Sequence, residues 1–260
     1  MHYKSHYETI NRHKMRITDL HDTLFPPNEM YLLSCEQNGR LPLIDCTKRH
    51  YASKARYENL HLMDEVVQTP LYGFPVIQPY NGTTDFEAIA YGKRNKHSGK
   101  GQFVHFFADD YTWANAIWNR MEQTLYHLRK FDGMFAPDFS IYIDRPKGFN
   151  LMQLFKNRLV TFHAQSIGYN VIPTVSFGDV DSLGYCFEGL PNKSVLGICG
   201  TGLENQSHRL HWEYGICALE EMKQPTLLIV YGEPIHVSGI QTPMIFIPDE
   251  HSKFHRHGKI

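Results

Sequence analysis

The sequence lacks a long apolar run, a paired cysteine motif and an excess of charge of either sign. No stretch approaches the ~18 consecutive apolar residues that a membrane-spanning helix needs, so we expect no association with a membrane. Residues 1–19 are polar and contain lysine and arginine, and they lack the apolar core of a signal peptide. These absences together predict a soluble cytoplasmic protein.

Cysteine and net charge narrow the class of protein further. The five cysteines are odd in number and form no C-x-x-C pair, which argues against a disulfide framework and a cysteine zinc site. The formal net charge is −1, so a global basic field for nucleic acid is absent, although a local basic patch stays open. Histidine is abundant at 16 residues. His208 and His211, with Glu204 one turn earlier, form a conceivable metal trio on a helix, but polar surface positions are the more common interpretation.

Short apolar runs alternate with segments of helical periodicity through most of the chain. The hydrophobic content of 42% is ample for a core. The spacing of the apolar residues and the positions of turn-forming residues predict the helices and strands. The expected strands cover 75–78, 87–91, 103–107, 139–143, 171–175, 194–199, 226–231 and 244–247, and the expected helices cover 111–130, 151–168, 183–187 and 210–222.

Strands that are separated by helices pair in parallel through right-handed crossovers. We therefore predict an α/β fold with a mostly parallel open sheet, about five strands in its regular part and helices on both faces. A partial β/α barrel is the alternative, if the strands at 75–78 and 87–91 join the others. Pro173 inside one strand indicates a sheet edge or a strand start. The predicted organisation is an irregular N-terminal elaboration at 1–70, the α/β domain at 71–250 and a flexible tail at 251–260.

Parallel α/β sheets bind ligands at the carboxyl ends of their strands, and polar residues follow the predicted strands here. Carboxylates gathered at one edge could hold a divalent cation such as magnesium, or divide acid and base roles between them. The competing interpretation is that aspartate caps helices after strands. The residues that follow the strands are Asp109, Asp110, Asp144, Arg145, Asp179, Asp181, Thr201, Gly202, Glu204, Gly232 and Glu233.

A glycine-rich turn at 197–202 lies between a predicted strand and a predicted helix. Its backbone N–H groups, which include those of Gly200, Thr201 and Gly202, could hold a phosphate beside the helix N-terminus. The turn is neither a dinucleotide fingerprint nor a P-loop, and glycines also serve tight turns alone. No Gly-x-Ser-x-Gly elbow or Cys–His signature is present.

A series of short motifs between about residues 70 and 235 resembles one family. They are Phe131-Asp132-Gly133, Pro137-Asp138-Phe139-Ser140, Asp144-Arg145-Pro146, Val171-Ile172-Pro173, Gly178-Asp179, Cys186-Phe187-Glu188-Gly189-Leu190-Pro191 and Ile229-Val230-Tyr231-Gly232. In this order they resemble the uncharacterised bacterial and phage family named domain of unknown function 4417. Where that family often has an Arg-Trp pair, this chain has Ser176-Phe177. The resemblance implies a bacterial or phage-borne cytosolic protein and transfers no catalytic residue, but it makes Asp138, Asp144 and Asp179 family-pattern positions.

Two function hypotheses follow. The first is an enzyme that acts on a phosphate-containing or nucleotide-like small molecule. Its candidate catalytic residues are Asp144, Asp179 and Asp138, and its candidate ligand-binding residues are Arg145, Gly200, Thr201, Gly202 and Glu233.

The second hypothesis is an accessory protein of a mobile element that binds nucleic acid or a host protein. It rests on the basic stretches 4–16, 48–56 and 93–100, which have Tyr51, Tyr57 and Tyr91 nearby. The competing interpretation of such stretches is a solvated face. The sequence leaves the reaction, the partner and the oligomeric state open.

Overall fold

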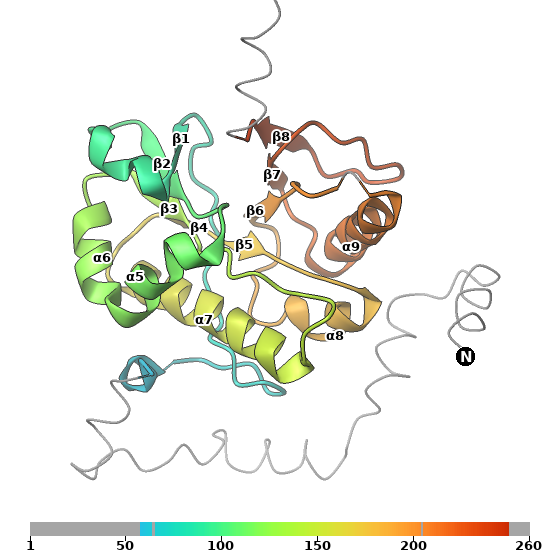
Figure 1. Cartoon of the computed structure of the whole chain (residues 1–260), viewed down its shortest axis with the longest axis horizontal. Helices are drawn as coiled ribbons and strands as arrows, with labels where there is room; N and C mark the ends of the chain where they lie inside the picture. The colour runs from blue at the N-terminus through green and yellow to red at the C-terminus, as the bar shows by residue number, and fades with distance from the viewer. Residues whose placement is uncertain (1–57, 64–65, 204, 250–260) are drawn as a thin grey trace, which may run out of the picture. The chain divides into compact units, whose positions relative to one another are not determined.

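The computed structural model describes residues 58–63, 66–203 and 205–249, which all fall within one unit, Cys46–Ile260 (Figure 1). Most of the N-terminal elaboration and the tail therefore lie outside the described residues. The strands are β1 (Glu87–Ala90), β2 (Gln102–His105), β3 (Gly133–Phe135), β4 (Val171–Ile172), β5 (Thr174–Val175), β6 (Val195–Cys199), β7 (Leu227–Tyr231) and β8 (Met244–Ile247). The helices are α5 (Ala114–Asn119), α6 (Met121–Leu128), α7 (Lys147–Ser166), α8 (Leu183–Cys186) and α9 (Gln206–Lys223), with short 3-10 turns η1 (Leu60–Met63), η2 (Tyr91–Lys96), η3 (Asp110–Thr112) and η4 (Val180–Ser182).

The strands form two parallel sheets in chain order, β1-β2-β3-β4 and β5-β6-β7-β8. Pro173 separates them within one extended segment. On its N-terminal side Ile172 pairs with Phe135 of β3, and on its C-terminal side Thr174 pairs with Gly197 of β6. Because proline has no N–H to donate, the ladder is interrupted at that point. Pro173 therefore marks a strand start, one of the two roles that the sequence indicated.

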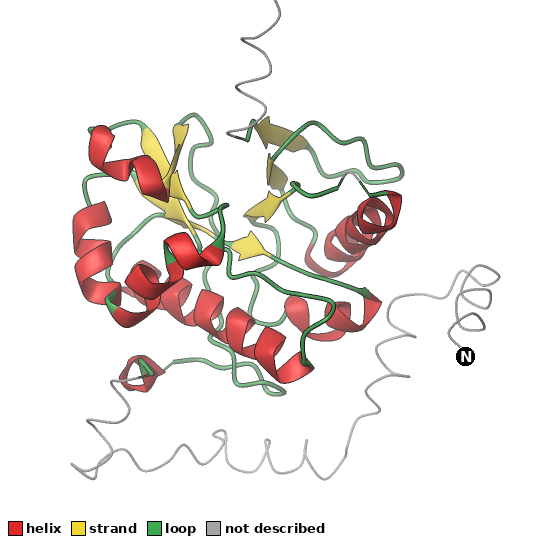
Figure 2. Ribbon diagram, viewed as in Figure 1, coloured by secondary structure: helices red, strands yellow, loops and turns green. Residues whose placement is uncertain are grey.

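The fold class predicted from the sequence, α/β with mostly parallel open sheets, is confirmed. Strands in chain order with right-handed crossovers carry their helices on one side, and Figure 2 shows the longer helices outside the strands. The described strands do not close into a ring, so no complete barrel forms among them.

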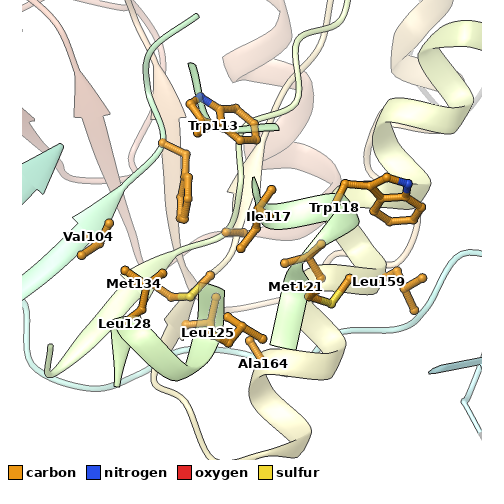
Figure 3. Packing of buried hydrophobic residues seen from close by; sticks show 14 of the residues in the cluster. Val104, Trp113, Ile117, Trp118, Met121, Leu125, Leu128, Met134, Leu159 and Ala164 are labelled. Atoms are coloured by element: carbon orange, nitrogen blue, oxygen red, sulfur yellow. The ribbon is translucent and has the colours of Figure 1, made fainter. Parts of the chain in front are cut away.

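Two hydrophobic clusters lie on opposite faces of the strands because side chains alternate along each strand. The outer cluster joins Val104 of β2 and Met134 of β3 to Ile117, Leu125 and Leu159 of the helices (Figure 3). The inner cluster contains residues of strands and loops only. Its buried members are Tyr80, Phe103, Phe107, Phe135, Ile172, Val195, Ile229 and Tyr231. The inner face of the strands is therefore filled mainly by aromatic side chains.

The strand predicted at 139–143 is wrong, since the third strand of the structure is β3, at Gly133–Phe135. A Cβ at Gly133 would lie 2.2 Å from the Phe103 ring, so close packing requires a glycine at a position that looks like a turn in the sequence. Phe139, by contrast, packs its ring 5.0 Å from that of Trp113, outside any ladder. The strand predicted at 75–78 is also absent, and only an isolated bridge from Gln68 to Pro75 forms there.

The predicted helices occur with changed boundaries. The one expected at 111–130 is divided into η3, α5 and α6, with a break at Arg120. Helix α9 begins earlier than its apolar spacing indicated because the Asn205 side chain accepts a hydrogen bond from Ser207 N–H at 2.8 Å. It ends at Lys223, because the C-cap residue Gln224 has a left-handed backbone (φ 50°) and is followed by Pro225.

Candidate functional site

Polar side chains from successive strands meet at the carboxyl ends of the parallel strands. Asp138 follows β3, and Ser176 follows β5 and donates its hydroxyl proton to Asp138 at 2.5 Å. His105 ends β2, and its ring lies 4.8 Å from that of Tyr231, which ends β7. Parallel strands bring their carboxyl ends to one edge, which is where α/β proteins bind ligands.

Asp138 has the most perturbed carboxyl group at this edge. Its side chain is half-buried, and burial raises its pKa from 3.8 to about 7. The hydrogen bond from Ser176 opposes this rise in pKa, and the nearby charge of Asp110 adds to it. A carboxyl group that titrates near neutral pH can both accept and release a proton under physiological conditions.

Asp110, in η3, is a second carboxylate with a different environment. It accepts hydrogen bonds from the backbone N–H of Ser140 (3.1 Å), from the Ser140 hydroxyl (2.9 Å) and from Gln153 Nε2 (3.2 Å). Burial raises the pKa of Asp110, while the bonds from Ser140 and the charge of Lys156 lower it. Several donors on one carboxylate favour its ionised form. The two carboxyl groups therefore differ, with several donors at Asp110 and one hydroxyl donor at Asp138.

An aromatic wall adjoins these groups. The His105 ring is buried, stacks on Phe107 at 5.6 Å and contacts Tyr231. Its Nδ1 accepts a hydrogen bond from the backbone N–H of Phe107 at 3.3 Å, so the neutral ring carries its proton on Nε2.

Cys199 ends β6, and its Sγ lies 3.1 Å from the hydroxyl of Thr201. Burial raises the pKa of the Cys199 thiol to about 11, and the nearby Asp138 adds to that rise. The thiolate is the nucleophilic form of cysteine. The site therefore holds a protonated thiol at neutral pH and is not built for cysteine nucleophilic chemistry.

Asp144 and Arg145 lie in an exposed loop between β3 and α7. Arg145 Nε is 3.9 Å from Asp144 Oδ1, and both side chains are largely open to solvent. The sequence analysis expected a strand at 139–143, directly before these two residues. The third strand is instead β3, at Gly133–Phe135, so Asp144 and Arg145 do not follow a strand directly. Their role as catalytic and ligand-binding residues stays a prediction.

Asp179 caps the 3-10 turn η4. Its Oδ1 accepts a hydrogen bond from Ser182 N–H at 3.1 Å, and the Ser182 hydroxyl donates to the Asp179 carbonyl oxygen at 2.6 Å. These contacts are those expected of an aspartate that caps a helix, which was the competing interpretation of this residue. A catalytic role for Asp179 stays a prediction.

In the glycine-rich turn, Gly200 is closely packed, whereas Gly202 has open space around it. Gly200 N–H donates to the carbonyl oxygen of Tyr231 at 2.8 Å, and a Cβ on Gly200 would lie 2.8 Å from Val230. Gly202 has a left-handed backbone (φ +75°) with open space around it, and Thr201 is exposed. Thr201 and Gly202 therefore remain the candidates in this turn for holding an anion. Glu233 is exposed after β7, and its ligand-binding role stays a prediction.

No group of three or more histidine, cysteine, aspartate or glutamate side chains suited to a metal ion occurs among the described residues. His208 Nδ1 lies 3.4 Å from the Gly202 carbonyl oxygen, and Glu204 lies outside the described residues. Within the same part of the chain, no helix is long and apolar enough to cross a membrane.

Three residues of this edge were not found by sequence reasoning, namely His105, Gln153 and Ser176. His105 gave a signal, since it is a polar side chain inside an otherwise apolar strand. Ser176 gave a weaker one, as it stands where the resembled family often has arginine. Gln153 gave none, because its contact with Asp110 joins positions 43 residues apart.

Fold and site together define an α/β protein with a carboxylate-bearing edge, and similarity to known proteins specifies its family. The chain belongs to the family described as Domain of unknown function (DUF4417), whose model matches residues 67–247. It is similar to the Gene 1 protein of Mycobacterium phage L5, with 26% identity over 200 residues that cover 75% of this chain and 87% of that protein. It is also similar to the Gene 1 protein of Mycobacterium phage D29, with 27% identity over 146 residues, 56% of this chain and 54% of that protein. No solved structure matches the chain.

Proposed function

We propose that the protein is an enzyme that performs acid–base chemistry on a phosphate-containing or nucleotide-like ligand at the carboxyl ends of its parallel strands. The observation that carries the proposal is the half-buried Asp138 carboxyl group, hydrogen-bonded to Ser176 beside a second carboxylate, Asp110. Paired carboxyl groups whose environments move their pKa values apart commonly divide acid and base roles.

The contacts suggest a role for each residue. Asp138 exchanges a proton with the ligand, because it titrates near neutral pH and is half-buried rather than sealed. Asp110 accepts hydrogen bonds from Ser140 and Gln153, and the bonds from Ser140 oppose the rise in its pKa that burial causes. Ser176 orients the Asp138 carboxyl group through its hydroxyl. Proton transfer by a positioned carboxyl group contributes roughly 10²–10⁴-fold to a rate.

Groups that favour an anion follow β3 and β6 in the chain. Thr201 and Gly202 precede the N-terminus of α9, where the helix dipole favours negative charge. Arg145 and Lys147 lie at the start of α7 and are exposed. These residues are suited to a phosphate group.

A ligand screen followed by one pair of variants tests the proposal. Thermal unfolding is measured against nucleotides and sugar phosphates, with and without magnesium, because a ligand that binds the native state raises the apparent stability. Turnover of each stabilising compound is then followed across pH for the wild type, Asp138→Asn and the exposed Asp144→Asn.

We expect kcat/KM to change with pH around pH 7, where Asp138 titrates. Asp138→Asn should abolish this pH dependence and lower the rate by about 100-fold or more. Asp144→Asn should keep the pH dependence of the wild type. A rate loss in Asp144→Asn with none in Asp138→Asn would refute the assignment of Asp138, and failure of every compound to bind or turn over would refute the ligand class.

A further inference from the structure

Two basic segments that lie far apart in the sequence pack together beside the N-terminal ends of β2 and β3. Lys130 Nζ donates to the carbonyl oxygen of His97 at 2.6 Å, and Gly101 N–H donates to the Asp132 carboxylate at 2.8 Å. We call the resulting surface the basic loop surface. It consists of Lys96, Lys100, Arg129 and Lys130.

The loop that carries this surface is held in one conformation. Gly99 has a left-handed backbone (φ +100°), and a Cβ there would lie 2.1 Å from the Lys130 carbonyl oxygen, so the two segments are in direct contact. Gly99 N–H donates to Gln102 Oε1 at 2.9 Å, and Gln102 Nε2 donates to Glu87 Oε2 at 2.7 Å. A loop fixed in this way loses little conformational entropy when it binds a partner.

Positive charge is segregated on this surface. The whole chain has a formal net charge of −1, yet residues 91–101 contain four lysine and arginine residues and no aspartate or glutamate. The neighbouring carboxylates of Glu87 and Asp132 accept hydrogen bonds from Gln102 and Gly101. Lys96 and Lys100 are exposed. A concentrated positive charge of this kind attracts a polyanion.

An exposed aromatic ring adjoins the cations. Tyr126, at the end of α6, is 56% exposed, and the Arg129 guanidinium lies 3.7 Å from its ring centroid. Tyr91, the aromatic residue that the sequence placed near this loop, is instead buried, with the Arg94 guanidinium 3.8 Å from its ring. Tyr126 and Arg129 thus offer a flat face on which an unpaired base can stack.

From this arrangement we propose that the basic loop surface binds single-stranded nucleic acid. Lys96, Lys100 and Lys130 contact successive phosphates, and Tyr126 with Arg129 stacks a base. An anionic bilayer fits less well, because residues 92–100 offer no apolar side chain to insert. The proposal does not depend on the acid–base site, which lies at the carboxyl ends of the strands.

Fluorescence anisotropy with a labelled single-stranded oligonucleotide of about 20 nucleotides tests this proposal, using the full chain at several salt concentrations. Each phosphate contact adds about −0.7 to the slope of log K against log salt for single strands. We expect K96Q/K100Q to make that slope shallower by about 1.4. Tyr126→Ala removes one stacked base and should weaken binding about fivefold or more.

Matched variants lie outside the surface. Lys193 is an exposed lysine before β6, and Tyr111 is an exposed tyrosine in η3. Lys193→Gln and Tyr111→Ala should bind as the wild type does. The basic residues at 4–16 and 48–56 are present in every variant, so differences between variants report on the loop alone.

Three results would overturn the proposal. One is an unchanged affinity and salt slope in K96Q/K100Q. Another is equal binding of duplex and single strand that Tyr126→Ala leaves unaltered. The last is binding to phosphatidylserine-containing vesicles with no binding to the oligonucleotide.

Discussion

Replacing Asp138 by asparagine should stabilise the protein at neutral pH and leave its stability unchanged in acid. Burial raises the pKa of this carboxyl group from 3.8 to about 7, so ionising it is costly in the folded state. A group whose folded pKa is raised contributes full stability below its unfolded pKa and loses that contribution as pH rises through its folded pKa. Asparagine keeps an oxygen that accepts from Ser176 and carries no charge to desolvate.

The magnitude follows from the two pKa values. Each unit of pKa difference corresponds to about 1.4 kcal/mol, so the full difference is worth about 4 kcal/mol at most. The advantage of Asp138→Asn over the wild type should be near zero at pH 4 and grow by about 1.4 kcal/mol per pH unit. It should level off above pH 7.

Urea denaturation of both proteins at several pH values between 4 and 8 measures this difference directly. Titration of the Asp138 carboxyl group by ¹³C NMR gives the midpoint independently. Ser176→Ala should raise that midpoint, because it removes the hydrogen bond that favours the ionised form. A stability difference that does not change with pH, or a midpoint below pH 5, would refute the reasoning.

Substitutions at three further positions test the packing and the capping. Arg158 is buried and donates to the backbone carbonyls of Thr174, Cys186 and Glu188. Arg158→Met should therefore lower the free energy of unfolding by about 3 kcal/mol or more in urea denaturation, and a loss below about 1 kcal/mol would contradict this. Leu125 is fully buried in the outer cluster, so Leu125→Ala should cost about 2–5 kcal/mol in the same assay, and a cost like that of an exposed residue would contradict the placement. Asp179→Asn should unfold like the wild type while Asp179→Ala loses about 1 kcal/mol, since asparagine can also accept from Ser182; equal losses in both would count against the cap.

The sequence predicted those strands that are apolar on both faces. β2, β6 and β7 read as near-continuous apolar runs, which is how strands of parallel sheets appear. β3 escaped detection because packing on Phe103 requires Gly133, and glycine looks like a turn residue when its neighbours in space are unknown. The apolar residues of 139–143 gave the wrong strand, although Ile143 and Tyr142 are in fact exposed.

The candidate site was only partly predictable for a related reason. The sequence does not separate Asp138 from Asp144, since Asp138 follows Pro137 and Asp144 stands two residues before Pro146 in one stretch of chain. Burial separates them, and burial is a property of the folded chain: Asp138 gains Ser176 and Asp110 as neighbours, while Asp144 stays in solvent. The raised pKa of Asp138 is therefore a consequence of contacts that span 28 and 38 residues.

The break at Pro173 connects the fold to the site. Backbone pairing between β3 and the next segment stops at Ile172, so the chain beyond could diverge from Asp138. Side chains take over there. Asn157 Nδ2 donates to the carbonyl oxygen of Pro137 at 2.7 Å and to the Thr174 hydroxyl at 2.8 Å. These bonds from α7 hold the segment after β3 beside the segment after Pro173, and so set Ser176 against Asp138. Because buried side chains fill the inner face of the strands, we place the chemistry at this edge instead.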